Sequence, residues 1–136
     1  MKSNMQTPYK LRRGATAVET ALAAPLLFLV FFAGLEFARA NMVRNVTENA
    51  ALEGARAGIL PGAIAQDCID KANAELLKLA INGATVSVDP PVIEPTTAQV
   101  AVSVSVPLSQ NSMPLSKFVV GRTLIQSITL NREINQ

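Results

Sequence analysis

Glu19 is the residue whose type and position point most directly to a specific chemistry. It is the one acidic residue among the first 35, and it directly precedes an uncharged run over residues 20–35. A carboxylate in a membrane helix costs on the order of 3 kcal/mol, so it usually has a partner. Five residues before it, Gly14 follows the basic pair Arg12-Arg13. This position of Glu19 predicts a carboxylate that either pairs within the membrane or snorkels to its surface.

Gly14 has the properties of a cleavage site at a membrane surface. Because it has no side chain, a membrane peptidase can grip extended backbone beside it. The basic residues that precede it are Lys2, Lys10, Arg12 and Arg13. These charges resist insertion and would hold the Gly14–Ala15 bond at the cytoplasmic face. Cleavage there would create a new α-amino group on Ala15.

The composition excludes several function classes. The sequence pI is about 9.0, but four of the twelve Lys and Arg residues precede Gly14. Without those four, eight basic residues face ten acidic ones, so the rest of the chain carries a net charge of −2 and nucleic-acid binding is not expected. The sequence has no His, no metal-ligand cluster, no nucleophile–base pair and no Gly-rich phosphate loop. We therefore expect no enzyme, no cofactor and no metal.

The apolar run spans a membrane only together with the residues before it. Residues 20–35 form about 24 Å of helix, short of a hydrocarbon core of about 30 Å. Residues 15–19 lengthen this helix to about 31 Å and place Glu19 at the cytoplasmic edge. The positive leader predicts a cytoplasmic N-terminus with the bulk of the chain outside. Pro25 predicts a kink in this helix, although prolines are also tolerated in membrane helices without a role.

Helical spacing continues beyond the membrane to Gly58, before the helix-breaking pair Pro61-Gly62. Residues 50–58 are rich in Ala and Gly, so a neighbouring element can approach them closely. Two pairs in this part of the chain have i,i+3 spacing and are expected to be solvent-facing contacts: Glu36 with Arg39, and Glu53 with Arg56.

The remainder predicts a second helix over residues 63–81, stopped by Asn82-Gly83, and then three strands. The expected strands are residues 85–89, 100–106 and 122–131. The loop over 108–121 has a possible helical turn at 114–120. Cys68, the single cysteine, is expected to be a buried helix residue, with an intermolecular bridge or lipid attachment as alternatives. The fold class is α+β, and the long helix is expected to cover the small antiparallel sheet.

The segment around residues 12–58 resembles the TadE-like family of Tad pilus pseudopilins and, more broadly, class III prepilin signals. The residues that carry this resemblance are Arg13-Gly14, Ala15-Thr16-Ala17, Val18-Glu19, Pro25, Glu36-Phe37 and the segment Asn49-Ala50-Ala51-Leu52-Glu53-Gly54-Ala55-Arg56. Thr20 departs from the family, which commonly has an aromatic residue after the glutamate. The resemblance implies a pilin-like fold and cleavage by a prepilin peptidase. It also implies that Glu19 pairs with the Ala15 ammonium of a neighbouring subunit.

The expected organisation is a basic cytoplasmic leader over 1–14 that is cleaved, a long helix over 15–58, transmembrane to about 35, and an extracytoplasmic α+β domain over 59–136. The resemblance implies a minor pilin or pseudopilin in the inner membrane that assembles into, or primes, a Tad-type type IV pilus. Its partners would be other pilin or pseudopilin subunits and the pilus assembly platform. The alternative is a secreted or membrane-anchored interaction domain unrelated to pili. Residues 38–40 offer a conventional signal-peptidase site for that alternative.

Overall fold

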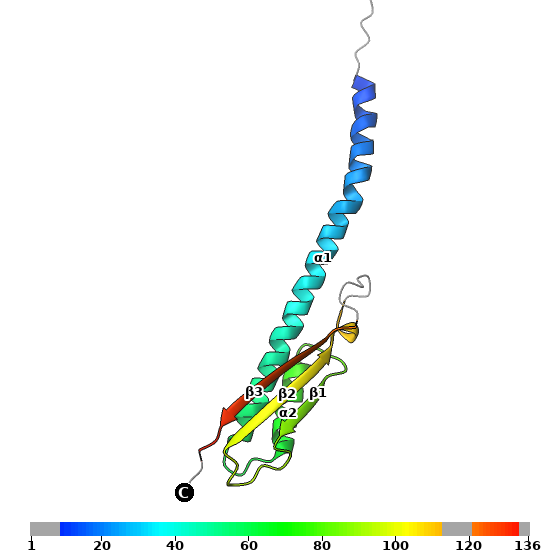
Figure 1. Ribbon diagram of the computed structural model, residues 1–136. Coiled ribbons are helices and arrows are strands. Elements are labelled where there is room, and N and C mark those ends of the chain that lie inside the picture. The colour runs from blue at the N-terminus through cyan, green and yellow to red at the C-terminus, as the bar shows by residue number, and fades with distance from the viewer. Residues whose placement is uncertain (1–8, 113–120, 134–136) are drawn as a thin grey trace, which may run out of the picture. The chain divides into compact units, whose positions relative to one another are not determined.

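The structure is a computed structural model that describes residues 9–112 and 121–133, with side chains from residue 14 onward. The chain divides into two compact units, Met1–Leu35 and Glu36–Gln136. A long helix, α1 (Tyr9–Gly58), contributes to both units. The other elements of the second unit are α2 (Ala65–Leu77), β1 (Thr85–Asp89), β2 (Gln99–Pro107), the 3₁₀ turn η1 (Leu108–Gln110) and β3 (Thr123–Asn131) (Figure 1). This order confirms the predicted α+β class, whereas the possible helical turn at 114–120 lies outside the described residues.

The long helix begins earlier than the sequence predicted. The long helix was expected over residues 15–58, but α1 already begins at Tyr9. The residues between Tyr9 and Gly14 are Lys, Leu and two Arg, which are all good helix formers. One glycine costs a helix only about 1 kcal/mol relative to alanine. The Gly14–Ala15 bond therefore lies in helical rather than extended backbone. The predicted end of the helix at Gly58 is confirmed.

The three strands form an antiparallel meander in the order β1-β2-β3. Ser87 lies opposite Ser103, which in turn lies opposite Ser127. The predicted alternation along β2 is confirmed. Its four fully buried side chains are Val100, Val102, Val104 and Val106, and the residues between them are partly exposed. One face of the sheet is thus buried, while the other presents mainly small polar side chains together with the exposed Ile125.

The buried face of the sheet packs against the two helices. The core residues from α1 are Val43, Val46, Ala50, Ala51 and Ala55, and those from α2 are Cys68, Ala72 and Leu76. All of these α1 residues belong to the second unit. In Figure 1 the strands lie in front of α2 and of this part of α1. The part of α1 beyond residue 35 supplies the helical layer that the small sheet needs, as the sequence predicted.

Two glycines allow α1 to approach its neighbours closely. A Cβ atom added at Gly58 would lie 2.8 Å from both Cys68 Sγ and Val100 Cγ1. One added at Gly54 would lie 3.0 Å from the Cys68 carbonyl oxygen and 3.1 Å from Val102 Cγ1. These distances are shorter than ordinary van der Waals contacts. The Ala- and Gly-rich segment is therefore a packing surface inside the domain, which confirms the expected close approach.

α2 ends differently from the expected stop at Asn82-Gly83. The Ile81 N–H donates to the Leu76 carbonyl at 3.1 Å, and the Ala80 N–H donates to the Leu77 carbonyl at 3.1 Å. This double closure is a Schellman motif, which requires a left-handed residue at its C′ position. Ala80 occupies that position with φ = 50°. The helix thus terminates on an alanine where glycine is usual. Leu76 before it and Ile81 after it are both buried in the core.

We predict that Ala80→Gly stabilises the domain by about 0.5–1 kcal/mol. Glycine removes the steric penalty of a left-handed alanine, an effect partly offset by the greater freedom of glycine in the unfolded chain. Urea unfolding of the full chain in detergent, followed by circular dichroism, measures the change. The matched control is Ala74→Gly at an exposed position within α2, which should instead destabilise by about 1 kcal/mol. A lower unfolding midpoint for Ala80→Gly would contradict the assignment of the motif.

Candidate membrane helix and processing junction

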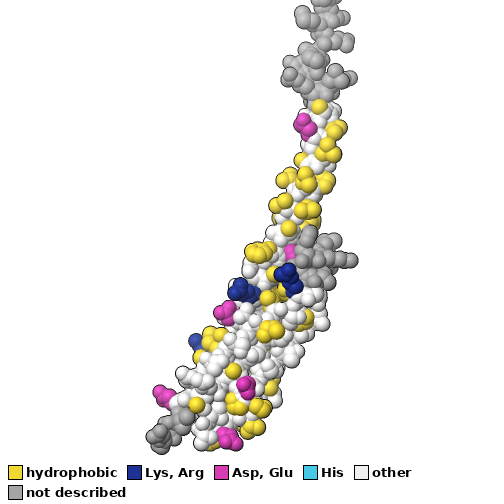
Figure 2. Space-filling view, in the orientation of Figure 1, with side chains coloured by type: hydrophobic (Ala, Val, Ile, Leu, Met, Phe, Trp, Pro, Cys, Tyr) yellow, Lys and Arg dark blue, Asp and Glu magenta, His cyan; other side chains and the backbone are white. Residues whose placement is uncertain are grey.

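Residues 14–35 of α1 present an apolar surface that the rest of the described chain does not cover. The large exposed apolar side chains here are Val18, Leu22, Leu26, Leu27, Phe28, Leu29, Val30, Phe31, Phe32 and Leu35. Figure 2 shows apolar side chains along this segment. Within the described residues, the segment Gly14–Gly58 is the one helix long and apolar enough to cross a membrane. A helix that is apolar all round is typical of a membrane span or of burial among other helices.

Pro25 lies in the middle of this apolar segment. α1 continues as helix through Pro25 without a break. The local loss of a backbone donor is therefore accommodated within helical geometry, and the kink stays a prediction. Just beyond, the Phe28 and Phe32 rings stack with their centroids 6.4 Å apart, and Phe31 meets Phe32 edge-on at 5.8 Å. These rings enlarge the apolar surface of the helix in the part that follows Pro25.

Gly14 and Glu19 both lie on open stretches of the helix. A Cβ added at Gly14 would meet no other described part of the chain within 4 Å. Glu19 is exposed. Of the residues that the structure describes, none forms an ion pair with the Glu19 carboxylate. The carboxylate is therefore available to a partner from outside the chain. The backbone of Arg12 and Arg13 belongs to the first part of α1.

Thr20 stands where the family commonly has an aromatic residue, and its hydroxyl has a local partner. Thr20 Oγ1 donates to the Thr16 carbonyl oxygen at 2.9 Å. This back-bonding satisfies a polar group that would otherwise face an apolar environment. The departure at Thr20 is therefore compatible with burial of this part of the helix in lipid.

The two expected ion pairs on α1 have different outcomes. Arg56 and Glu53 form the predicted exposed pair, with Nη1 and Oε1 2.7 Å apart. The expected solvent-facing contact of Glu36 with Arg39 is wrong, because Glu36 is only 3% exposed. Arg39 Nε instead donates to the Asn111 carbonyl oxygen at 3.1 Å. Packing of the second unit around the helix, which local spacing does not encode, decides the environment of these side chains.

Asn111 is a buried polar residue that sequence reasoning did not single out. Its Oδ1 accepts from the Asn82 N–H at 2.9 Å, and its Nδ2 donates to the Asn82 and Pro107 carbonyls, both at 2.9 Å. Its carbonyl accepts from Arg39. Asn111 thus joins the segment before η1 and the loop before β1 through its side chain, and α1 through its carbonyl, near the start of the second unit. Turn composition alone could have marked it only as a loop residue.

Cys68 is fully buried in α2, as predicted. Burial raises the pKa of its thiol, and the nearby Asp67 carboxylate raises the pKa further. Since the thiolate is the reactive form, Cys68 in the folded protein is expected to react slowly with thiol reagents. In the described part of the chain, no group of three or more His, Cys, Asp or Glu residues is placed to hold a metal ion.

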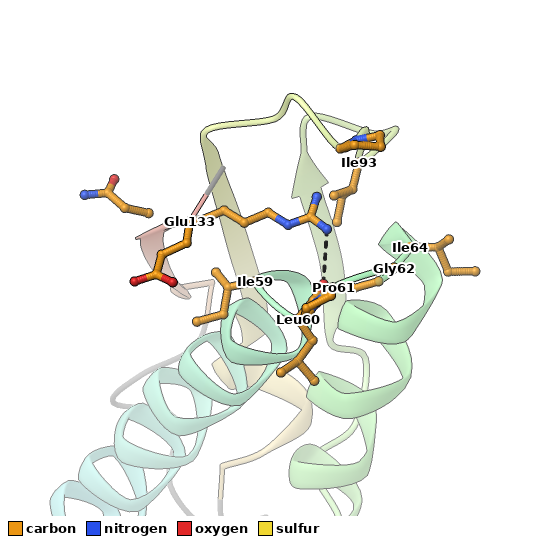
Figure 3. A pocket seen from close by; sticks show the side chains of 11 residues that line it. Ile59, Leu60, Pro61, Gly62, Ile64, Ile93 and Glu133 are labelled. Carbon is orange, nitrogen blue, oxygen red and sulfur yellow. Dashed lines mark hydrogen bonds between the residues drawn. The ribbon is translucent and has the colours of Figure 1, made fainter. Parts of the chain in front are cut away.

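A cavity of about 640 Å³ opens where α1 ends, next to the end of β3. Figure 3 shows Ile59, Leu60, Pro61 and Ile93 around it. Arg132 Nη2 donates to the Leu60 carbonyl at 3.2 Å (Figure 3). Its Nη1 donates to the Glu94 carbonyl at 2.8 Å. The residues that line the cavity include no nucleophile paired with a base. The cavity is thus a mostly apolar hollow braced by one arginine, without the groups of a catalytic centre.

Comparison with known proteins supports the resemblance over part of the chain. Searches of curated proteins and of solved structures each gave no significant match. The model of one family, described as TadE-like protein, matches residues 14–56. The match covers the Gly14–Ala15 bond, the exposed apolar segment and most of the α1 surface that packs on the sheet. The chain therefore carries a TadE-like segment over residues 14–56, as its residues indicated, and the sheet that follows lies outside the matched segment.

Proposed function

We propose that this protein is a minor pilin-like subunit of a Tad-type pilus, anchored in the cytoplasmic membrane before it enters the filament. The observation that carries the proposal is the coincidence of the TadE-like match with an exposed apolar helix that contains Glu19. The N-terminus would lie in the cytoplasm because the leader is positive. The second unit, from Glu36 onward, would lie on the extracytoplasmic side and present the folded domain.

In this proposal a prepilin peptidase cleaves the bond between Gly14 and Ala15. Arg12 and Arg13 would keep that bond at the cytoplasmic face, where the leader is removed. Since the bond lies in helix, the peptidase must open about one turn to reach extended backbone. Gly14 lowers the cost of that opening because glycine is the weakest helix former after proline.

Glu19 would direct assembly after cleavage. The new Ala15 ammonium of one subunit and the Glu19 carboxylate of its neighbour are opposite charges in a medium of low dielectric constant. Such a pair fixes the axial register of two helices more than it adds stability, because desolvation offsets much of the Coulomb energy. The partners are other pilin or pseudopilin subunits and the assembly platform, and the part played by the protein is structural rather than enzymatic.

The size of the folded domain favours a minor subunit over the main pilin. Bulk pilins of this pilus class, as the resemblance implies, are little more than leader and helix. Here α2 and a three-stranded sheet follow the long helix. Quantitative mass spectrometry of purified filaments tests the proposal. We expect this chain at a small fraction of the main pilin, whereas equal abundance would contradict a minor role and absence would contradict incorporation.

The alternative of a conventional secreted protein fits the structure less well. Signal-peptide cleavage after Ala40 would cut inside the second unit, which begins at Glu36. It would also remove Arg39, which donates to Asn111. A helix that continues without interruption from the apolar segment into the core is the arrangement of an anchored domain.

A further inference from the structure

Both outer strands of the sheet have an edge that pairs with no other strand in the described chain. β1 and β3 each pair only with β2. β3 is nine residues long and contains neither a charged residue nor a proline. Proteins usually protect such edges with Lys, Pro or a bulge, because unpaired backbone groups there recruit further strands. The edge of β3 is therefore suited to accept another strand.

The hydrogen bonds at the two ends of β3 show which backbone groups point outward. The Arg132 N–H donates to the Ala98 carbonyl at 2.8 Å, and the Leu108 N–H donates to the Arg122 carbonyl at 2.9 Å. With the register of the pair, these bonds assign the even-numbered residues of β3 to bonding with β2. The backbone groups that face the free edge thus belong to the odd-numbered residues Thr123, Ile125, Ser127, Thr129 and Asn131. Their side chains lie on the exposed face of the sheet.

The free edge of β1 has the opposite pattern. The even-numbered residues of β2 bond β3, so its odd-numbered residues bond β1, and Ser103 exchanges bonds with Ser87. The outward-facing groups of β1 therefore belong to Val86 and Val88. Their side chains lie on the core face, together with the β2 valines. The outward-facing backbone groups therefore belong to residues of the exposed face at the β3 edge, and to residues of the core face at the β1 edge.

These two patterns are complementary when the strands run in the same direction. In a parallel pair, one residue bonds both neighbours of the residue opposite it, and opposite residues share a face. Ser127 can therefore bond Val86 and Val88 of another copy while lying opposite Ser87. Both serines then lie on the exposed face. Parallel pairing of two β3 strands requires one copy to be turned about the strand axis, so the exposed face of one sheet would continue into the core face of the other.

The direction of the strands selects between this pairing and an antiparallel one. Arg132, just after β3, donates to Leu60, just after α1. Arg122, just before β3, accepts from Leu108 of η1. The next residue after η1, Asn111, accepts from Arg39 near the start of the second unit. β3 therefore runs in the direction of α1. Antiparallel β3–β3 pairing would set two α1 helices head to tail. Copies anchored in one membrane share one orientation, which excludes that arrangement.

We propose that β3 of one copy pairs in parallel with β1 of a second copy, with Ser127 opposite Ser87, so that the two sheets become continuous. Ser127 and Ser87 are the central residues of their strands. The shared orientation of the two copies in one membrane rests on the proposed function. The complementarity of the free backbone groups of β3 and β1 rests only on the hydrogen bonding within the sheet. β1 has only five residues, so the contact is weak in free solution. Anchoring in one membrane raises the effective concentration enough for it to form.

Disulfide trapping in membranes tests this pairing with the full-length chain. Two differently tagged chains, one with Ser87→Cys and one with Ser127→Cys, are co-expressed and oxidised mildly. Ser103 lies between these two positions within one chain, so they are separated by two strand spacings of about 4.8 Å each. That separation exceeds the reach of an intramolecular disulfide. Buried Cys68 should not contribute, which oxidation of the unsubstituted chain verifies.

We expect a disulfide-linked dimer that carries both tags, and no dimer from either variant alone. Replacing Ser127→Cys by Ser103→Cys, on the central strand of the same exposed row, should abolish the dimer. Adding Thr129→Pro to the Ser127→Cys chain should reduce it at least fivefold, since Pro removes an outward-facing N–H and leaves the β2 bonds intact.

Three outcomes would overturn the pairing. The first is a dimer from Ser127→Cys alone, which would indicate antiparallel pairing of two β3 strands. The second is a disulfide to a different protein in place of the mixed dimer. The third is the absence of any mixed dimer. Protection of Cys68 from alkylation shows that each variant is folded. A mature N-terminus at Ala15 together with no mixed dimer refutes only the pairing, whereas a different N-terminus refutes the proposed function.

Discussion

Glu19→Ala is expected to leave cleavage after Gly14 intact and to abolish incorporation into filaments. In the proposed function the peptidase would act beside Gly14, one helical turn or more from the substituted side chain. In the filament, however, the Ala15 ammonium of the neighbouring subunit would lose its partner in an apolar environment. Removing one member of a buried ion pair costs about 3–5 kcal/mol. That loss corresponds to a decrease of roughly 100-fold or more in the association constant.

The measurement is the amount of tagged protein in sheared filaments, together with the mature N-terminus of the protein left in the membrane. Glu48→Ala is the matched control, since Glu48 is an exposed carboxylate on the same helix in the second unit. The control should enter filaments at the level of the unsubstituted chain. Normal incorporation of Glu19→Ala, or an equal loss for both variants, would contradict the role of Glu19.

Gly58→Val is expected to destabilise the second unit strongly. Even the first added carbon would lie 2.8 Å from both Cys68 Sγ and Val100 Cγ1. Val100 is a fully buried residue of the central strand and Cys68 is a fully buried residue of α2, so neither can move far. Overpacking of a core costs about 1–3 kcal/mol and occasionally more, out of a typical total stability of 5–15 kcal/mol. Valine adds two further carbons at a site without room for one.

Alkylation of Cys68 reports this loss of structure. The folded protein should protect the thiol, because it is buried and its pKa is raised by burial and by Asp67. Gly58→Val should increase the alkylation rate at least tenfold. Gly34→Ala is the control on the same helix, where an added Cβ meets no described atom within 4 Å, and it should leave the rate unchanged. Equal protection in all three proteins would show that the packing at Gly58 is not as tight as the structure indicates.

The sequence predicted those parts of the fold that depend on short-range periodicity. The alternation of valine with small residues over 100–106 identified the central strand and its buried face. The Ala- and Gly-rich segment identified the surface where α1 meets α2 and β2. Gly14 and Glu19 were selected as candidate processing and assembly residues because they differ so clearly from the charges and apolar residues around them, and these two roles stay predictions.

The features that the sequence could not predict depend on residues distant in the chain. Asn111 is a loop residue whose importance comes from Asn82 and Arg39, far from it in sequence. Glu36 is buried although its spacing to Arg39 is that of an exposed pair. α2 ends at a left-handed Ala80 because this end buries Leu76 and Ile81 in the core. The stronger local signal for a helix end was Gly83.

The mature N-terminus of the protein tests the central claim most directly. Terminal sequencing or top-down mass spectrometry of the full chain, expressed with its prepilin peptidase and purified from membranes, gives this residue. A pilin-like subunit cleaved after Gly14 must begin at Ala15. A protein that begins at Asn41 would be a conventional secreted protein, and one that retains Met1 would be a plain membrane anchor, so either result would contradict the account.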